Sequence, residues 1–326
     1  MSVAALRVSP PEPAVSREEF LRAVERAAQQ AALGGAAALG VALAELGLSG
    51  GKRIRSRLSY ECARALGGDP TRAIPVAAAV EMIHAASLCH DDVIDRASLR
   101  RGRPTLNVRF GDRESVLLGD YLFASAWLVV GGRAAAASLL AEAVASMSQA
   151  ELLQARLLWN PDPGVESCYA VMRGKTAALF SACAGATALA LDAPEEAVAA
   201  FRSFGLSFGT AFQLIDDVLD YEPGDGSLGK EPLMDLRSGL VTLPLAHALS
   251  TGNGAGRRAV LDHFQSRGAC ALDGPLVVGL LLATGALERC RRIARELISE
   301  AVAALAPYVS PSGLTEFAQA TLERRS

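Results

Sequence analysis

The sequence predicts an all-α protein, and three observations lead to that class. Apolar residues recur at helical spacing along most of the chain. No run of alternating polar and apolar residues is bounded by turn residues, so no strand is expected. Many of the predicted helices are apolar around most of their circumference, as in the centre of a large bundle. With 51% hydrophobic and 21% charged residues in 326, the chain can bury a sizeable core and is not a disordered protein.

The helices are predicted in chain order. Residues 1–15 contain three prolines and are expected to form a flexible tail. Ser16 and Glu19 fit a capping box, which starts a helix that runs to about residue 46 with a break near Gly34. Pro75 suits the first turn of a long helix that has no breaker. The remaining pattern predicts helices over 53–66, 76–96, 113–131, 134–158, 165–191, 195–221, 240–250, 257–266, 272–283 and 285–306. Nothing marks a linker, so 16–326 is expected to be one helical domain.

Composition and charge exclude several classes of protein. The 32 basic and 35 acidic residues give a net charge of −3, which argues against a nucleic-acid partner. The longest weakly polar stretches, 176–191 and 274–287, are shorter than a membrane-spanning helix needs, so no transmembrane segment is expected. No secretory signal is visible, and the six cysteines form no Cys-x-x-Cys motif. A cytoplasmic protein with reduced thiols is therefore expected.

Two copies of an Asp-Asp-x-x-Asp motif, at 91–95 and 216–220, each follow a long apolar helix. Within each copy the first and last aspartates share one helix face, where like charges repel and oppose the helix dipole. A hard cation would compensate for this charge, and Mg²⁺ accepts carboxylate oxygens together with water and phosphate. No Cys or His spacing suits zinc, and the Ca²⁺-binding hand pattern is absent from the sequence. One such motif is most simply a solvated helix end, whereas two copies predict a metal site.

Four basic motifs are interleaved with the aspartates: Gly-Gly-Lys-Arg-Ile-Arg at 50–55, Arg-Arg-Gly-Arg-Pro-Thr at 100–105, Arg-Gly-Lys-Thr at 173–176 and Gly-Lys at 229–230. Glycine lets the backbone approach an anion closely, and Lys and Arg bind phosphate oxygens. His84, seven residues before Asp91, faces the same way and could bind the same anion. The combination predicts binding of more than one diphosphate, held by metal on one side and by cations on the other.

Together with Phe-Gln-Leu-Ile-Asp-Asp at 212–217, these motifs resemble the trans-polyprenyl diphosphate synthases of the polyprenyl synthetase family, of medium or long-chain type. The resemblance runs from about 50 to 247. It implies the isoprenoid synthase fold, in which helices surround a deep central cavity, and usually a homodimer. It also implies a prenyltransferase that condenses an allylic diphosphate with isopentenyl diphosphate in trans, head-to-tail fashion.

The resemblance also assigns roles to residues. Up to three Mg²⁺ would be held by Asp91, Asp95 and Asp216. The catalytic set would add Asp92, Asp217, Asp220 and Lys175. The allylic diphosphate would contact Arg100, Lys175, Thr176, Gln213 and Lys230. Isopentenyl diphosphate would contact Lys52, Arg55, His84 and Arg101. The departing diphosphate, rather than a side chain, would accept the final proton.

The sequence departs from the family pattern at two positions. Ser56 stands where the family often has proline after the first basic motif. Leu240 stands where a lysine commonly precedes Val-Thr-Leu-Pro, which removes one cation from the allylic site. Activity is expected to survive, because the metals and Lys230 remain.

Product length is expected to follow the depth of an apolar slot beneath Asp91. Ala86 and Ser87 lie just over one turn away and are small, whereas bulky aromatics near there close the slot in short-chain members of the family. The floor would then be formed by residues farther along this helix or on its neighbour: Met82, Ile83, Phe123 and Trp127. At about one isoprene unit per helical turn, the expected product has about seven or eight units, C35–C40.

Three alternatives remain open. A short-chain farnesyl or geranylgeranyl diphosphate synthase differs only in slot depth. A terpene cyclase shares the fold but normally has a different second metal motif and no isopentenyl site. A non-catalytic partner subunit should have lost its aspartates, and all six are present.

Overall fold

The computed structural model describes residues 15–33, 52–100, 102–222 and 233–323. It is 78% helical, which confirms the all-α class. The helices of the first half are α1 (Arg17–Leu33), α3 (Ile54–Ala65), η2 (Pro70–Ala73), α4 (Ile74–Ile94), α5 (Leu106–Phe110), α6 (Asp112–Val130) and α7 (Ala134–Leu157). Those of the second half are α8 (Val165–Met172), η3 (Arg173–Ala177), α9 (Ala178–Ala190), α10 (Glu195–Leu219), α11 (Met234–Arg237), α12 (Leu243–Thr251), α13 (Gly254–Gln265), α14 (Gly274–Ala283), α15 (Ala286–Leu305) and α16 (Ser312–Leu322).

The chain divides into two compact units. Unit 1 comprises Met1–Glu142, Phe180–Ser203 and Ala304–Phe317, and unit 2 comprises Ala143–Leu179, Phe204–Ala303 and Ala318–Ser326. The first aspartate cluster belongs to unit 1, and the second belongs to unit 2.

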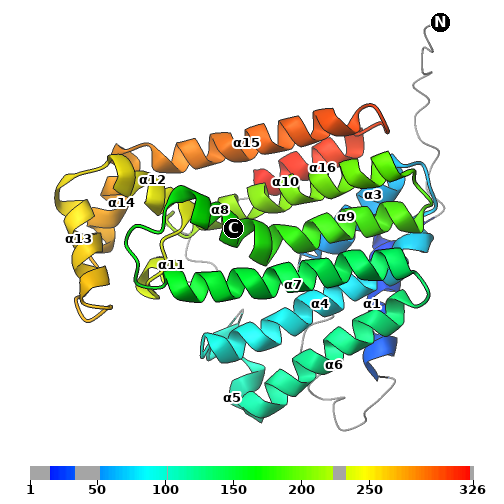
Figure 1. The fold of residues 1–326 in the computed structure, drawn as a ribbon, viewed down its shortest axis with the longest axis horizontal. Helices are drawn as coiled ribbons and strands as arrows, with labels where there is room; N and C mark the ends of the chain where they lie inside the picture. Colours follow the sequence, from blue (N-terminus) through cyan, green and yellow to red (C-terminus); the bar gives the residue numbers. More distant parts are fainter. Residues whose placement is uncertain (1–14, 34–51, 101, 223–232, 324–326) are drawn as a thin grey trace, which may run out of the picture. The chain divides into compact units, whose positions relative to one another are not determined.

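Unit 1 is built around α4, which packs most extensively against α6 and also against α1 and α3 (Figure 1). Alanine is abundant on α4, and its apolar residues from Val76 to Cys89 are almost all buried, so neighbouring helices can pack on several sides. Pro75 lies in its first turn as predicted. The predicted capping box at the start of α1 is confirmed, because the Ser16 N–H donates to Glu19 Oε2 at 2.8 Å and the Glu19 N–H donates to Ser16 Oγ at 3.3 Å.

Unit 2 contains the second half of α10, where three phenylalanines recur every four residues. The rings of Phe204 and Phe208 lie 6.2 Å apart, and those of Phe208 and Phe212 lie 6.4 Å apart. Phe204, Phe208 and Val218 are fully buried, so this part of α10 is a core helix that ends at the second aspartate cluster. In the same unit, α13 packs against α14, and α12 contacts both α8 and α14 (Figure 1).

The expectation of no strands was wrong in one small detail. Leu99–Arg100 and Arg103–Pro104 form a two-residue antiparallel ladder inside the predicted loop. Gly102, with φ +74°, supplies the left-handed residue that so tight a reversal requires. The short α5 follows the ladder. These elements are too short to give a periodic signal.

Other boundaries also differ from the prediction. The expected helix over 165–191 is interrupted by η3, a π-helical turn. The helix predicted from 240 begins only at Leu243, because Gly239 adopts φ +83° and Pro244 lies in the first turn. The helices α11 and α16 were not predicted.

Among the described residues, two helices are long and apolar enough to cross a membrane: Pro70–Ile94 and Glu195–Leu219. In their most apolar windows 61% and 56% of the residues are buried in the fold, and core helices of soluble proteins meet the same criterion. The prediction that no segment spans a membrane therefore stays a prediction. All six cysteines are free thiols, and only Cys270 is exposed.

Candidate functional site

The first aspartate cluster lies at the C-terminal end of α4. Asp92 is buried and Asp91 half-buried, whereas Asp95 is exposed and caps the helix. Arg100 donates from Nε and Nη2 to Asp92 Oδ1, at 2.9 and 2.7 Å. The structure therefore brings together an aspartate of the first motif and a cation of the neighbouring basic motif. Arg101 lies outside the described residues.

The short ladder presents Arg100 to this cluster. The Ala97 N–H donates to the Asp92 carbonyl at 2.9 Å, and the Thr105 hydroxyl donates to the Ala97 carbonyl at 2.6 Å. Thr105 is itself buried. These hydrogen bonds hold the ladder against the last turn of α4. The Arg100 side chain can therefore reach the Asp92 carboxylate.

His90 directs its ring away from the helix end and onto α6. Its Nε2 lies 3.1 Å from the Val116 carbonyl oxygen and 3.4 Å from Asp120 Oδ1. A Cβ on Gly119 would lie 2.3 Å from Nε2, so only glycine leaves room for the ring. The roles of His90 and Gly119 are not evident from the sequence, because their contact joins residues far apart in the chain.

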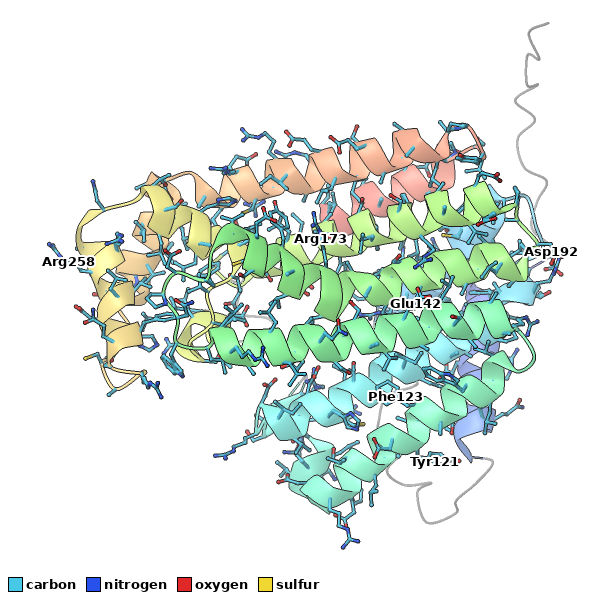
Figure 2. The ribbon with its side chains drawn as sticks, in the orientation of Figure 1. Tyr121, Phe123, Glu142, Arg173, Asp192 and Arg258 are labelled. Atoms are coloured by element: carbon cyan, nitrogen blue, oxygen red, sulfur yellow. The ribbon has the colours of Figure 1, made fainter. Side chains whose placement is uncertain are left out.

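The predicted chain-length residues lie on α4 and α6. Met82, Ile83 and Ala86 are fully buried, whereas Ser87 is half-buried and its hydroxyl donates to the His84 carbonyl at 2.9 Å. Phe123, labelled in Figure 2, lies with its ring 5.6 Å from the ring of His90, which directly precedes the first aspartate cluster. Trp127, one turn farther along α6, is half-buried.

The residues predicted to hold isopentenyl diphosphate lie around the start of α3. Lys52 is exposed, and the Arg55 guanidinium lies 4.7 Å above the Phe180 ring. Arg53, between them, adopts φ 45° and pairs with Glu25 on α1 at 3.3 Å. The Arg53 side chain is thus directed to α1, whereas its neighbours Lys52 and Arg55 are the two cations that were predicted to bind substrate. His84 is half-buried on α4.

The second aspartate cluster ends α10 in unit 2. Asp217 is buried, whereas Asp216 and Asp220 are half-buried. Gln213 donates through Nε2 to Asp217 Oδ1 at 2.8 Å, and Thr176 donates through Oγ1 to Gln213 Oε1 at 2.8 Å. One hydrogen-bond chain therefore joins Thr176 of the Arg-Gly-Lys-Thr motif to two residues of the Phe-Gln-Leu-Ile-Asp-Asp motif. Lys230 lies outside the described residues.

Charge is crowded at this end of α10. Burial raises the pKa of Asp217 well above its usual range, and the carboxylates of Asp235, Asp216 and Asp220 raise it further, against the hydrogen bond from Gln213. Asp235, on the unpredicted α11, is a member of the cluster that the sequence motif did not reveal. A nearby cation would relieve this repulsion.

The donor set fits Mg²⁺ bound mainly by substrate and water. No group of three or more His, Cys, Asp or Glu side chains within the described ranges is arranged to hold a metal ion by itself. Mg²⁺ usually takes only one or two carboxylates and completes its shell with water and phosphate oxygens. The residues present therefore fit a metal that arrives with a diphosphate better than a metal held in a protein cage.

The π-helical turn η3 carries two predicted site residues, Lys175 and Thr176. Lys175 Nζ lies 2.6 Å from Glu151 Oε2 on α7. Gly174 allows this approach, since a Cβ there would lie 2.6 Å from the Ala150 Cβ. The Arg173 guanidinium is instead 5.3 Å from the Tyr169 ring centroid, on the exposed side (Figure 2). Neither Glu151 nor the π turn is evident from the sequence, because both depend on contacts between helices.

The loop that lacks the usual lysine is well fixed. The Trp159 N–H donates to the Gly239 carbonyl at 2.8 Å, and the Leu240 N–H donates to the Asp235 carbonyl at 2.9 Å. A Cβ on Gly239 would lie 2.5 Å from the Trp159 ring. Leu240 therefore occupies an ordered position, and Trp159 is a supporting residue that the sequence did not reveal.

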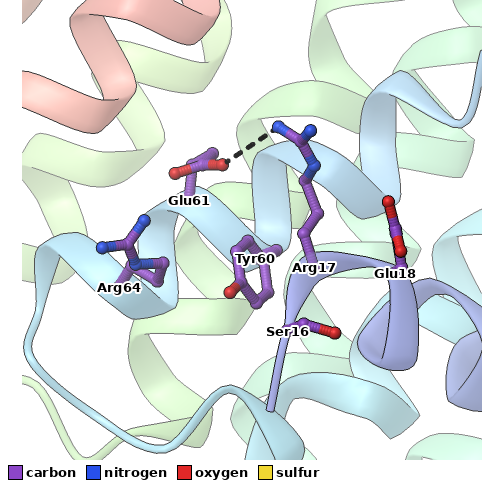
Figure 3. Close-up of a pocket in the computed structure, with 6 residues that line it drawn as sticks. All are labelled: Ser16, Arg17, Glu18, Tyr60, Glu61 and Arg64. Carbon is purple, nitrogen blue, oxygen red and sulfur yellow. Dashed lines mark ion pairs between the residues drawn. The ribbon is translucent and has the colours of Figure 1, made fainter. Parts of the chain in front are cut away.

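One pocket of unit 1 is separate from all the predicted site residues. It has a volume of about 300 Å³ and is lined by Ser16, Arg17, Glu18, Tyr60, Glu61 and Arg64 (Figure 3). Arg17 Nη1 lies 3.9 Å from Glu61 Oε1, and burial raises the pKa of Glu61. Its lining mixes both signs of charge, which is not the pattern of a diphosphate site.

Comparison with known proteins agrees with the motifs. The Polyprenyl synthetase family matches residues 38–273. Octaprenyl diphosphate synthase of Escherichia coli is 36% identical over 78% of this chain and 80% of its own. Geranylgeranyl diphosphate synthase of Mycobacterium tuberculosis is 33% identical over 85% of this chain and 81% of its own. The crystal structure of a Caulobacter crescentus polyprenyl synthase, complexed with calcium and isoprenyl diphosphate, has 32% identity and a TM-score of 0.86, covering 97% of this chain and 100% of that one. The chain therefore belongs to the polyprenyl synthetase family and has its isoprenoid synthase fold.

Proposed function

We propose that this prenyltransferase extends an allylic diphosphate with isopentenyl diphosphate to a polyprenyl diphosphate of about seven or eight isoprene units. The observation that carries this proposal is the pairing of each aspartate cluster with its own basic or polar motif. Arg100 binds Asp92 in unit 1, and Thr176 reaches Asp217 through Gln213 in unit 2. Charged residues arranged in this way suit a substrate bound through both metal and cations.

The proposed cofactor is Mg²⁺, up to three ions, with Asp91, Asp95 and Asp216 as ligands. The crowded carboxylates around Asp217 support a divalent cation, and the related Caulobacter crescentus protein was crystallised as a complex with calcium and isoprenyl diphosphate. When bound, the metal would neutralise the charge that develops on the leaving diphosphate.

The side chains would then act by binding and orientation. Arg100, Lys175, Thr176, Gln213 and Lys230 would hold the allylic diphosphate and stabilise its developing charge as the C–O bond breaks. The second substrate would be held by Lys52, Arg55, His84 and Arg101, with its double bond directed at the allylic carbocation. No nucleophilic side chain is required, and the departing diphosphate would accept the proton. Water must be excluded until the new C–C bond has formed.

The proposed chain length rests on small residues near the first aspartate cluster. Ala86 is fully buried on α4 and Ser87 is half-buried, so no bulky side chain occupies these two positions. The Escherichia coli relative makes an octaprenyl product, whereas the Mycobacterium tuberculosis relative makes a geranylgeranyl one. A short-chain synthase is therefore the second candidate.

A homodimer is also proposed. Leu117, Ala124 and Leu128 recur along one face of α6, and all three are exposed, Leu128 by 80%. An exposed apolar stripe on an otherwise well-packed helix is typical of a subunit interface.

The test is a product assay with purified protein, Mg²⁺, isopentenyl diphosphate and, in separate reactions, geranyl, farnesyl and geranylgeranyl diphosphate. Mass spectrometry should show products extended to about C35–C40, and EDTA should abolish them. Asp91→Asn and Asp216→Asn should each lower the rate by about 100-fold or more, because each would weaken binding of the metal that neutralises charge on the leaving diphosphate. Products no longer than C20 would instead support the short-chain alternative.

The same assay separates the remaining alternatives. Hydrocarbon released from farnesyl diphosphate without isopentenyl diphosphate would indicate a terpene cyclase. An inactive homodimer that activates another synthase subunit would indicate a regulatory partner.

A further inference from the structure

Ser56, the residue that replaces the proline common in the family, makes two specific hydrogen bonds. It is fully buried in the first turn of α3. Its N–H donates to Glu81 Oε1 at 3.1 Å, and its hydroxyl donates to the same oxygen at 2.5 Å. Glu81 lies on α4, where it is the only Asp, Glu, Lys or Arg between Val76 and Cys89.

Glu81 acts as an N-terminal cap for α3, because its carboxylate accepts a hydrogen bond from a backbone N–H in the first turn of that helix. The first four amides of a helix have no partner within the helix, and the Ser56 N–H is one of them. Arg53, at the N-cap position, makes no side-chain cap. The carboxylate of Glu81 supplies the missing acceptor from a different helix, and its negative charge is favourable at a helix N-terminus.

The two helices joined by this contact carry two of the four residues assigned to isopentenyl diphosphate. Arg55 immediately precedes Ser56 on α3, and His84 lies one turn beyond Glu81 on α4. Other contacts hold the same end of α3: the Cys183 thiol donates to the Arg55 carbonyl at 3.3 Å, and Phe180 lies beneath the Arg55 guanidinium. A shift of the α3 N-terminus would therefore move Arg55 relative to His84.

We propose that Glu81 is a positioning residue for isopentenyl diphosphate. By capping α3 through Ser56, it fixes Arg55 and His84 at the spacing that one diphosphate requires. This inference rests on the proposed function. The presence of Ser56 in place of proline then has a role. Proline has neither the backbone N–H nor the hydroxyl from which Glu81 accepts hydrogen bonds.

The sign of the expected effect distinguishes positioning from simple electrostatics. Glu81 is an anion close to a site for an anionic substrate, so removal of its charge alone should tighten isopentenyl diphosphate binding. Loss of a positioning contact should weaken it. Glu81→Ala removes both the charge and the acceptor, whereas Glu81→Gln removes the charge and keeps an acceptor oxygen.

The experiment measures KM for each substrate at saturating concentrations of the other, and the Kd of isopentenyl diphosphate by calorimetry in the presence of Mg²⁺. Glu81→Ala should raise KM and Kd for isopentenyl diphosphate about tenfold and leave KM for the allylic substrate within about twofold, because a lost hydrogen bond to a charged group has an effect of this order. Ser56→Ala, which keeps the N–H but loses the hydroxyl, should show about a threefold rise. Glu81→Gln keeps the acceptor oxygen and loses only the charge, so its KM and Kd for isopentenyl diphosphate should stay at or below the wild-type values.

Ser59→Ala is the matched control. Ser59 is also on α3, is equally buried, and pairs with Thr187 Oγ1 at 2.8 Å rather than with Glu81. It should lower Tm to a similar extent as Ser56→Ala but leave both KM values unchanged.

Three results would overturn the inference while leaving the proposed function intact: a lower KM for isopentenyl diphosphate in Glu81→Ala, an equal rise in both KM values, or the same rise in Ser59→Ala. A wild-type protein that neither binds isopentenyl diphosphate nor forms product would overturn the proposed function, and this inference with it.

Discussion

Asp217 shows how a single residue of the site is shaped by burial and by its neighbours. Its carboxyl is buried, accepts a hydrogen bond from Gln213 and faces three other aspartates, so its pKa is raised well above the ordinary 3.8. A raised pKa means that the folded protein binds this proton more tightly than the unfolded chain does. The stabilising contribution is complete below pH 3.8 and is lost as the pH rises through the folded-state pKa.

Asp217→Asn should therefore stabilise the metal-free protein at neutral pH. Asparagine keeps the acceptor for Gln213 and removes the buried charge, so Tm at pH 7 in EDTA should rise by about 2 °C. The difference should shrink as the pH falls toward 4, where the wild-type carboxyl is protonated. Differential scanning fluorimetry across this range measures both effects. A wild-type protein more stable than the variant at pH 7 in EDTA would contradict a raised pKa for Asp217.

The residues of the site differ in how far the sequence could predict them. The aspartates, Lys175, Thr176 and Gln213 lie in local motifs, and a hydrogen-bond chain from Thr176 through Gln213 to Asp217 joins three of them. Glu151, Asp235 and Trp159 were missed. Each contributes through a contact with a residue distant in the sequence, which no local pattern encodes.

At the scale of elements, helix cores were predictable and helix interruptions were not. The apolar periodicity of α4, α6, α7 and α10 is long enough to be read directly from the sequence. The π turn η3 has the composition of an ordinary helix, and its extra residue is accommodated by packing against α7 at Gly174. Tertiary contact, rather than propensity, therefore accounts for this turn and for the ladder that presents Arg100.

Gly174→Ala tests the close approach of η3 to α7. The added Cβ would lie 2.6 Å from the Ala150 Cβ and 3.0 Å from the Ser146 carbonyl oxygen, and neither atom can move without the backbone. We expect a loss of about 1–3 kcal/mol in the free energy of unfolding. KM for the allylic substrate should also rise, because the Lys175–Glu151 pair is displaced.

Gly279→Ala is the control for this substitution. Gly279 lies in α14, also in unit 2, and an added Cβ would meet nothing within 4 Å. Helix propensity alone should then stabilise the protein by about 0.5–1 kcal/mol. Urea unfolding measures the free energy of unfolding of both variants. If Gly174→Ala increased it, η3 and α7 could move apart without loss of stability.

At the scale of the whole molecule, the exposed stripe on α6 should decide the oligomeric state. Leu117→Lys combined with Leu128→Lys places two charges on that stripe, and burying them in an interface would be strongly unfavourable. Light scattering after gel filtration should show a change from a dimer to a monomer of 33.9 kDa. Leu282→Lys, at a position 66% exposed on α14, should leave the dimer intact. A wild-type protein that is already monomeric would remove the homodimer proposal.

On the proposed function, product length is also a property of the whole molecule, because it would depend on how far the growing chain extends along α4. Ala86→Phe would place an aromatic ring just over one turn from Asp91, so elongation should stop several isoprene units earlier. Overpacking at this fully buried position lowers stability as well, so Tm must be followed in parallel. Ile83→Ala provides the opposite test without overpacking: if Ile83 forms the floor of the slot, its truncation should lengthen the product by about one unit, the length of one helical turn. Mass spectrometry of the dephosphorylated products resolves both shifts. An unchanged product distribution in both folded variants would show that the chain does not run along this face of α4.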